Sequence, residues 1–358
     1  MGGIASMDHL LQIQPPAQWL TWLFQVMPLF FFVGGYSNGV SWDGAQAKGL
    51  RYSFWLESRL RRLLGPVIPL VLLWAVLGIV GYYLGLPEKM IRVGSQIALV
   101  PTWFLAIYFV IVMLVPVTRA LWRKLGLLSV MLPFVFAVIG DIVFFNTDYQ
   151  WYGWFNYFFI WGAVHQLGYA WQQGRLKGVG PALCLAIMSA TLLLLLTQFG
   201  PYPISLIGVP GADFSNTTPP KLPLIALGLT QIGLLLALEG PARRWLSGAK
   251  AWTATVLVNG FIMPVFLWHS TVMILTIDVC FLLLPIVLSV QPGSGLWWAY
   301  RPLWIVTYLA IMMISLPLFM WLERKMGGGS SKHNTSVAVI VFGLTMCAGL
   351  AVMAGVGV

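Results

Sequence analysis

The chain has 358 residues, of which 59% are hydrophobic and only 8% are charged, and its mean hydropathy is +0.86. Soluble domains carry about 25% charged residues, so this composition excludes an ordinary soluble domain and indicates a membrane protein. The net charge of +10 could suggest a nucleic-acid ligand, but the basic residues lie at the ends of apolar segments, which argues against that partner.

Apolar segments long enough to cross a bilayer recur along the whole chain and predict an all-α, polytopic integral membrane helical bundle. A β-barrel would show short alternating segments, whereas these segments are continuously apolar. About ten spans are expected. They cover residues 17–40, 63–86, 97–118, 127–145, 153–172, 180–199, 222–239, 254–286, 302–322 and 336–356.

We expect one transmembrane domain over residues 1–358, because no segment has the composition of a separate soluble domain. Residues 1–16 form an outer leader in this prediction, and the Gly/Ser-rich residues 327–335 form a flexible linker before the last span at 336–356. The longest polar connections are expected at residues 41–62, 200–221 and 323–335.

The basic residues favour one orientation of these spans. If the connection at residues 41–62 is cytoplasmic, 16 of the 20 Lys and Arg fall on the inner side of a cell's inner (plasma) membrane. The remaining four are Lys89, Arg92, Lys221 and Arg301. Two crossings within residues 254–286 would spoil this pattern, so we expect one crossing that tilts or breaks near Pro285. Met1 then lies outside, and a further helix before it would give a more ordinary topology.

The densest charge lies within residues 30–66, where an apolar helix arrives at Gly34-Gly35-Tyr36 and a polar turn leads to the run Arg59-Leu60-Arg61-Arg62. Arg59 and Arg62 are three positions apart and share one helix face. Two guanidinium groups on one face can clamp the phosphates of a nucleotide-bearing substrate such as an acyl-CoA. The alternative is a topology anchor that pairs with anionic lipid.

Polar side chains at membrane depth are costly and are therefore candidates for function. They are Asn38, Asp141, His165, Asn259, His269 and Asp278. His269 lies near the middle of its span, where a neutral imidazole can accept a proton near pH 7 or simply hydrogen-bond a neighbouring helix. For His165 we favour helix packing. Asp141 and Asp278, near the outer ends of their spans, could line an outward cavity or reach interfacial water, and we favour interfacial water.

The cysteines give no sign of a metal site or a disulfide framework. Cys184, Cys280 and Cys347 lie inside apolar runs without metal-binding spacing, and are most simply small apolar core residues. The sequence implies neither a metal nor a permanently bound cofactor.

Four short motifs occur in order along the chain. Residues 30–36 (FFFVGGY) resemble an FFxxSGY signature, and residues 54–62 (FWLESRLRR) resemble an F-Y-x-x-R-x-x-R segment. Residues 101–116, which begin PTWFL and end in proline, are similar to a WxL…P helix, and residues 266–269 (FLWH) are similar to a Y-L-x-H element. Together the motifs resemble those of the membrane acyltransferase type 3 family over residues 20–325.

The resemblance implies an O-acyltransferase that moves an acyl group from a cytoplasmic acyl-CoA, its co-substrate, to a hydroxyl of an envelope glycan, glycolipid or small molecule. The bilayer, the acyl-CoA and a glycan or lipid acceptor are then its partners. The implied acyl-CoA-binding residues are Arg59, Arg62, Arg61, Tyr36 and Trp103. The residues inside the bundle that could act as catalytic base are His269 and His165.

One departure from the family pattern bears on activity. The family normally opens with a further helix that carries an arginine and the histidine taken as its catalytic base, and that helix would end just before residues 19–22. We therefore expect either a start upstream of Met1 or a truncated, inactive homologue. A lipid or sugar transporter or flippase is the other alternative, although the sequence shows no pseudo-symmetric halves.

Overall fold

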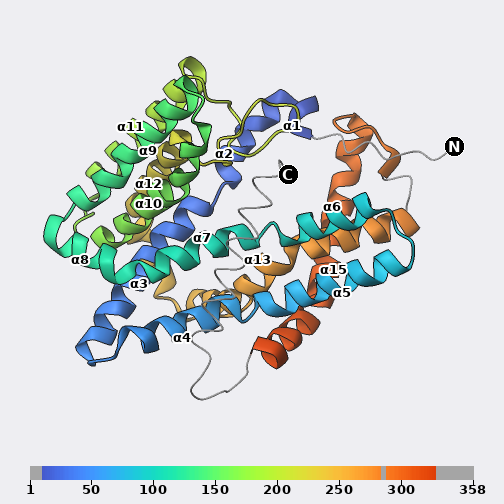
Figure 1. The fold of residues 1–358 in the computed structure, drawn as a ribbon, viewed down its shortest axis with the longest axis horizontal. Helices are drawn as coiled ribbons and strands as arrows, with labels where there is room; N and C mark the ends of the chain where they lie inside the picture. The colour runs from blue at the N-terminus through green and yellow to red at the C-terminus, as the bar shows by residue number, and fades with distance from the viewer. Residues whose placement is uncertain (1–9, 284–287, 328–358) are drawn as a thin grey trace. The chain divides into compact units, whose positions relative to one another are not determined.

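The computed structural model describes residues 10–283 and 288–327, and this part of the chain is built from helices without a β-strand (Figure 1). The helices are α1 (Leu10–Ile13), η1 (Pro15–Trp19), α2 (Leu20–Phe24), α3 (Met27–Ala47), α4 (Tyr52–Leu64), α5 (Val67–Tyr83), α6 (Glu88–Leu99), α7 (Thr102–Met113), α8 (Val115–Leu125), α9 (Leu128–Asn146), η2 (Gln150–Phe155), α10 (Asn156–Gln172), α11 (Val179–Phe199), α12 (Leu222–Leu246), α13 (Ala249–Leu283) and α15 (Gly295–Gly327).

The prediction of an all-α polytopic membrane protein is confirmed. Within residues 10–283 and 288–327, six helical segments are long and apolar enough to cross a bilayer, or up to eight if each of two bent helix pairs makes one span, so the predicted number of ten is not confirmed. The pair α4 and α5 bends by 41°, and the pair α6 and α7 bends by 45°. Pro66 and Pro101 lie at these breaks, where a proline removes a helical hydrogen bond.

Three predicted features lie partly or wholly outside the described residues. They are the first nine residues of the leader, the break near Pro285, and residues 328–358, which include most of the linker and the last span. The long span predicted at residues 254–286 is one continuous helix, α13, as far as Leu283, in agreement with a single crossing.

The chain divides into two compact units, which we name by their residues. Unit A comprises residues 8–51 and 110–251, and unit B comprises residues 52–109 and 252–358 together with residues 1–7.

In unit A, helix α10 packs against α3 and α9, and α11 packs against α12 (Figure 1). The contact between α3 and α10 is very close, because a Cβ atom at Gly35 would overlap the carbonyl oxygen of His165, and one at Gly168 would overlap backbone atoms of α3. Two aromatic pairs, Phe31–Trp161 and Phe32–Trp171, stack across the same contact with ring centroids 4.6 and 5.1 Å apart. Small residues thus bring the two helices together.

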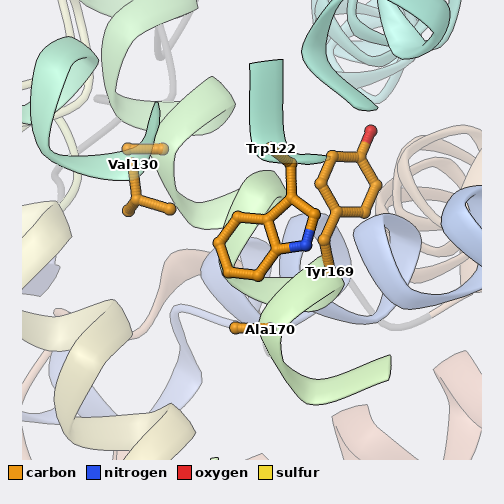
Figure 2. Close-up of a cluster of buried hydrophobic side chains, with 5 residues drawn as sticks. Trp122, Val130, Tyr169 and Ala170 are labelled. Atoms are coloured by element: carbon orange, nitrogen blue, oxygen red, sulfur yellow. The ribbon is translucent and has the colours of Figure 1, made fainter. Parts of the chain in front are cut away.

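A second part of the unit A core surrounds the indole of Trp122 on α8. Figure 2 shows this side chain beside Val130 of α9 and the α10 residues Tyr169 and Ala170. All four are buried. The cluster anchors the short amphipathic helix α8 to the rest of unit A.

The polar connection expected at residues 41–62 is largely helical, and the helix does not end at Gly34-Gly35-Tyr36. Helix α3 continues through Ala47, and only residues 48–51 separate it from α4. Trp42 and Ala45 are buried, so the polar extension keeps an apolar face against the protein. Gly49, with φ of +64°, then ends the helix in the left-handed conformation that glycine adopts readily.

Asp141 does not face interfacial water as expected, because its side chain is buried at 2% exposure. Its carboxylate accepts hydrogen bonds from the Asn156 amide (2.8 Å), the Tyr202 hydroxyl (2.8 Å) and the backbone N–H of Leu222 (2.9 Å). These donors satisfy the carboxylate and fix the connection at residues 200–221 to the bundle. The expectation was wrong because two of the three donors come from later in the chain, namely Tyr202 in the connection at residues 200–221 and Leu222 at the start of α12.

In unit B, helix α5 packs against α6 and α15, and α13 is held by polar contacts from both α5 and α15. The indole of Trp74 on α5 donates to the Thr271 hydroxyl of α13 at 3.0 Å. Trp268 of α13 donates to the Glu323 carboxylate of α15 at 2.9 Å, and its ring stacks on Phe319 with centroids 4.0 Å apart. These contacts fix the middle of α13, where His269 lies.

Candidate functional site

His269 lies on α13 with its side chain half-buried and both ring nitrogens in contact with oxygen atoms. Nδ1 lies 2.6 Å from the carbonyl oxygen of Phe266, and Nε2 lies 3.3 Å from the hydroxyl oxygen of Ser270. A carbonyl oxygen can only accept, so Nδ1 carries a proton, and in the neutral imidazole Nε2 then presents a lone pair. The imidazole is therefore held in the tautomer of a general base, with a hydroxyl group in front of its basic nitrogen.

The segment around His269 is held by α7 and α15. The Tyr308 hydroxyl of α15 donates to the carbonyl oxygen of His269 at 3.4 Å. The rings of Phe266 and His269 lie 6.0 Å apart, and Phe104 of α7 packs edge-on against Phe266 at 5.5 Å. With the Trp268 contacts to α15, these interactions limit the movement of the imidazole, which a positioned base requires.

The predicted basic cluster lies on α4, in unit B as well. Arg59 is half-buried and Arg62 is exposed. The electrostatic neighbours of Arg59 include Tyr108 of α7 and Arg62. Arg61 instead forms an ion pair with Glu57 one turn earlier, with Nη2 and Oε1 2.7 Å apart. The three arginines thus differ, since one of them is engaged by a carboxylate of its own helix.

Trp103 stands at the start of α7, half-buried, with its ring edge-on to Phe104 at 6.3 Å. Unit B therefore contains Arg59, Arg62, Trp103 and His269, all of which the sequence analysis selected.

The other two selected residues, Tyr36 and His165, belong to unit A. His165 is completely buried, with Nε2 3.1 Å from the Asn38 side-chain nitrogen and its ring edge-on to Tyr169 at 5.3 Å. Tyr36 is half-buried and its ring lies 4.6 Å from that of Trp171. Both residues are thus part of the contact between α3 and α10, where packing surrounds them.

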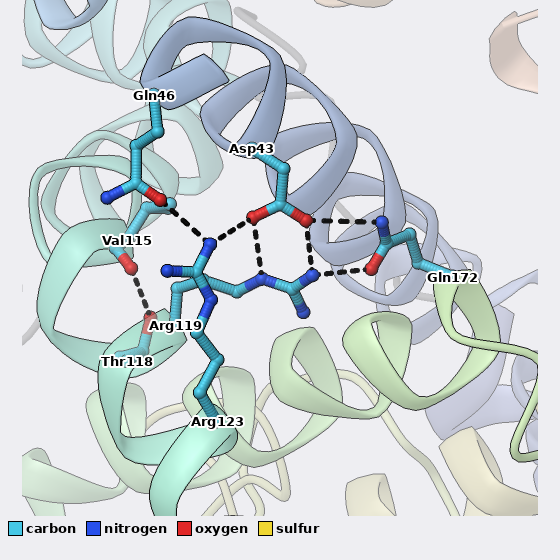
Figure 3. A network of polar contacts seen from close by, with 7 residues as sticks. All are labelled: Asp43, Gln46, Val115, Thr118, Arg119, Arg123 and Gln172. Carbon is cyan, nitrogen blue, oxygen red and sulfur yellow. Dashed lines mark hydrogen bonds and ion pairs between the residues drawn. The ribbon is translucent and has the colours of Figure 1, made fainter. Parts of the chain in front are cut away.

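The sequence analysis missed a charged network that joins α3, α8 and α10 in unit A (Figure 3). The guanidinium of Arg119, only 3% exposed, pairs with Asp43 and donates to the Gln172 amide oxygen at 2.7 Å. Arg123 also pairs with Asp43 at 2.8 Å and donates to Gln46 at 2.7 Å. The sequence analysis counted both arginines only among the 16 basic residues of the inner side, although their spacing of four positions on one helix face was a usable signal.

No group of histidine, cysteine, aspartate or glutamate side chains within residues 10–283 and 288–327 could hold a metal ion.

Comparison with known proteins identifies the class of protein. A family model described as an acyltransferase domain, that of the acyltransferase type 3 family, matches residues 3–290. No curated protein and no solved structure matches the chain. A helical membrane bundle with this match is a membrane acyltransferase by class. The chain belongs to the acyltransferase type 3 family, which confirms the resemblance seen in its motifs.

Proposed function

We propose that the protein is an integral-membrane O-acyltransferase, which moves an acyl group from a cytoplasmic acyl-CoA to a hydroxyl of an envelope glycan, glycolipid or small molecule. The observation that carries this proposal is the orientation of His269. Its Nδ1–H is held by the Phe266 carbonyl, and its Nε2 lone pair faces a hydroxyl oxygen at 3.3 Å. O-acyl transfer needs a base in this position to remove the proton of the attacking hydroxyl.

Arg59 and Arg62 supply the binding site for the phosphates of the donor. They share one face of α4, and Glu57 forms an ion pair with Arg61 of the same helix. Guanidinium groups bind phosphate oxygens through short charge-assisted hydrogen bonds. Trp103, on α7 in the same unit, contributes an aromatic surface to the donor site. The excess of basic residues on one side of the predicted spans supports a cytoplasmic position for α4 in the inner membrane.

In the reaction, Nε2 of His269 takes the proton of the attacking hydroxyl as its oxygen bonds to the thioester carbonyl carbon. The carbon–sulfur bond then breaks, and the thiolate leaves with the proton that His269 returns. Base catalysis of this kind contributes about 10²–10⁴-fold to a rate. Tyr308, through the backbone of His269, and Glu323, through Trp268, hold the base in place.

The test is turnover of radiolabelled acetyl-CoA by the purified full chain in lipid nanodiscs, with and without a mixture of lipid-linked glycans as acceptors. Labelled acceptor and released thiol are measured for the wild type and for the Arg59→Ala/Arg62→Ala double variant. Arg243→Ala, which removes an exposed arginine paired with Glu239, is the matched control. We expect transfer by the wild type and the control, and a loss of at least tenfold in the double variant.

Unchanged use of acetyl-CoA by the double variant would remove the phosphate clamp from the proposal. Uptake of lipid or sugar into vesicles without any need for acyl-CoA would establish a transporter instead. Wild-type protein that neither transfers an acyl group nor transports would establish an inactive homologue.

A further inference from the structure

The hydroxyl of Ser270 has an unusual partner for a serine inside a helix. Such hydroxyls commonly bond to the carbonyl four residues earlier. Among the described residues this bond, at 2.5 to 2.9 Å, is made by the hydroxyls of Ser189, Thr197, Thr230, Thr276, Thr307 and Ser315. The corresponding carbonyl for Ser270 is that of Phe266, which receives the Nδ1–H of His269. The Ser270 hydroxyl instead lies against Nε2 of His269.

In this arrangement the hydroxyl of Ser270 is hydrogen-bonded to the imidazole of His269, which is a base. Because Nε2 carries the lone pair, the Ser270 O–H donates to it, and the hydroxyl placed for deprotonation belongs to the protein itself. A nucleophile activated by an adjacent base that a third group orients is the arrangement of covalent catalysis. Here the base is His269 and the orienting group is the Phe266 carbonyl.

We propose that Ser270 is a covalent nucleophile that carries the acyl group between donor and acceptor. The inference rests on the proposed function, in which His269 is the base, and adds a step to it. Transfer then takes place in two half-reactions, so that free CoA can leave before the acceptor hydroxyl arrives.

Both half-reactions balance. In the first, the Ser270 oxygen attacks the thioester carbonyl carbon while its proton passes to Nε2 of His269, the carbon–sulfur bond breaks, and the leaving thiolate takes that proton. In the second, Nε2 takes the proton of the acceptor hydroxyl, whose oxygen attacks the serine ester. The ester bond to Ser270 breaks, and His269 returns the proton to the serine oxygen.

The surroundings of Ser270 suit an ester intermediate. Its side chain is 4% exposed, whereas the neighbouring His269 is half-buried, so water is restricted at the serine while the base keeps an open side. Exclusion of water protects a reactive intermediate from hydrolysis. Thr271, the next residue, is fixed by Trp74 of α5, which keeps the backbone of this turn in place.

The first experiment incubates the full chain in nanodiscs with radiolabelled acetyl-CoA and no acceptor, stops the reaction in acid and maps the labelled peptide. We expect label on the peptide that contains Ser270 and at least a tenfold loss of it in Ser270→Ala and His269→Ala. Ser315→Ala removes a half-buried hydroxyl that bonds to its own helix, and should keep the label. In Ser270→Cys the label should become releasable by neutral hydroxylamine, because the intermediate is then a thioester.

The second experiment uses an alkyl fluorophosphonate, which reacts with base-activated serines whatever the acyl donor is. Labelling of Ser270 that disappears in His269→Ala would support the nucleophile even if acetyl-CoA is not a donor, in which case the donor in the proposed function would be wrong. Failure of both reagents to label Ser270 would overturn the inference. Wild-type rates of acyl transfer in a folded Ser270→Ala variant would also overturn it while leaving the proposed function intact.

Discussion

Each of the two units has a histidine within a long helix, and the surroundings of the two histidines differ. In unit A, His165 is completely buried, its carbonyl lies against Gly35, and Asn38 and Tyr169 contact its ring. In unit B, His269 is half-buried, and a backbone carbonyl fixes its proton on the nitrogen away from Ser270. The comparison teaches that a position within an apolar helix does not distinguish a packing histidine from a base. The groups that the ring nitrogens contact distinguish the two.

The arginines show the same contrast. Arg119 in unit A is buried on Asp43 together with Arg123, so its charge is used to join helices. Arg59 and Arg62 in unit B lie on a helix whose glutamate, Glu57, is occupied by Arg61. The buried charges of unit A therefore stabilise the fold, and we propose that Arg59 and Arg62 of unit B bind a substrate.

The largest expected effect tests the two histidines directly. We expect His269→Ala to lower acyl transfer by about 10²–10⁴-fold, the usual contribution of a general base, with little change in melting temperature. We expect His165→Ala to destabilise the fold by about 2–4 kcal/mol, because it leaves a cavity and removes the partner of the Asn38 amide. Turnover and thermal unfolding in nanodiscs measure both. An inactive His165→Ala variant with an unchanged melting temperature would move the base to unit A.

In the charged network of unit A, removal of Asp43 should lower the unfolding free energy more than removal of Arg123. Asp43→Ala leaves the Arg119 guanidinium buried without a carboxylate, which we expect to cost about 3–5 kcal/mol of unfolding free energy. Arg123→Ala removes a side chain that is 48% exposed and should cost about 0–1 kcal/mol. Thermal unfolding of the two variants in one detergent provides the comparison. Equal costs would show that Arg119 does not depend on Asp43.

A pH titration tests the buried cation of unit A. Burial lowers the pKa of Lys221 to about 8 from its ordinary 10.5, although the Asp141 carboxylate opposes the shift. Between these two values the unfolded chain holds a proton that the folded chain has lost, so this group makes stability rise with pH through that window. Below pH 8 both states are protonated and the penalty is constant.

The expected gain over that window is at most about 3 kcal/mol, and it should be missing in Lys221→Met. Melting temperatures of the wild type and the variant between pH 7 and pH 11 provide the measurement. Parallel pH profiles of the two proteins would contradict the lowered pKa of Lys221.

The smallest expected effect is a difference in KM between variants of Arg59 and Arg61 on α4. We expect Arg59→Ala to raise the KM for acyl-CoA by about 10- to 150-fold, since a charge-assisted hydrogen bond contributes about 1.5–3 kcal/mol. Arg61→Ala should change KM less than Arg59→Ala, because Arg61 is held by Glu57. Steady-state kinetics at fixed ionic strength measure both values. An effect of Arg61→Ala as large as that of Arg59→Ala would show that the ion pair opens to bind the donor.

Much of the fold was predictable because hydropathy and proline placement are local signals. Most apolar spans coincide with helices, and the family follows from motifs that are each a few residues long. The extent of α3 was not predictable in the same way. Residues 41–47 look like a polar connection, and they are helical because Trp42 and Ala45 find a buried face and Asp43 finds its partners on α8.

The sequence by itself determined that this is a helical membrane protein of the acyltransferase type 3 family, and it selected His269, Arg59 and Arg62 as candidates. Only the tertiary structure decided that Arg119 meets Asp43 from 76 positions away, that His165 is enclosed by α3, and that Tyr308 and Glu323 hold the segment of His269. The physical reason is that a short stretch of sequence is enough to show which segments are apolar and will be buried. The partner of a polar group usually comes from another helix, and it determines whether that group stabilises the fold or is available for chemistry.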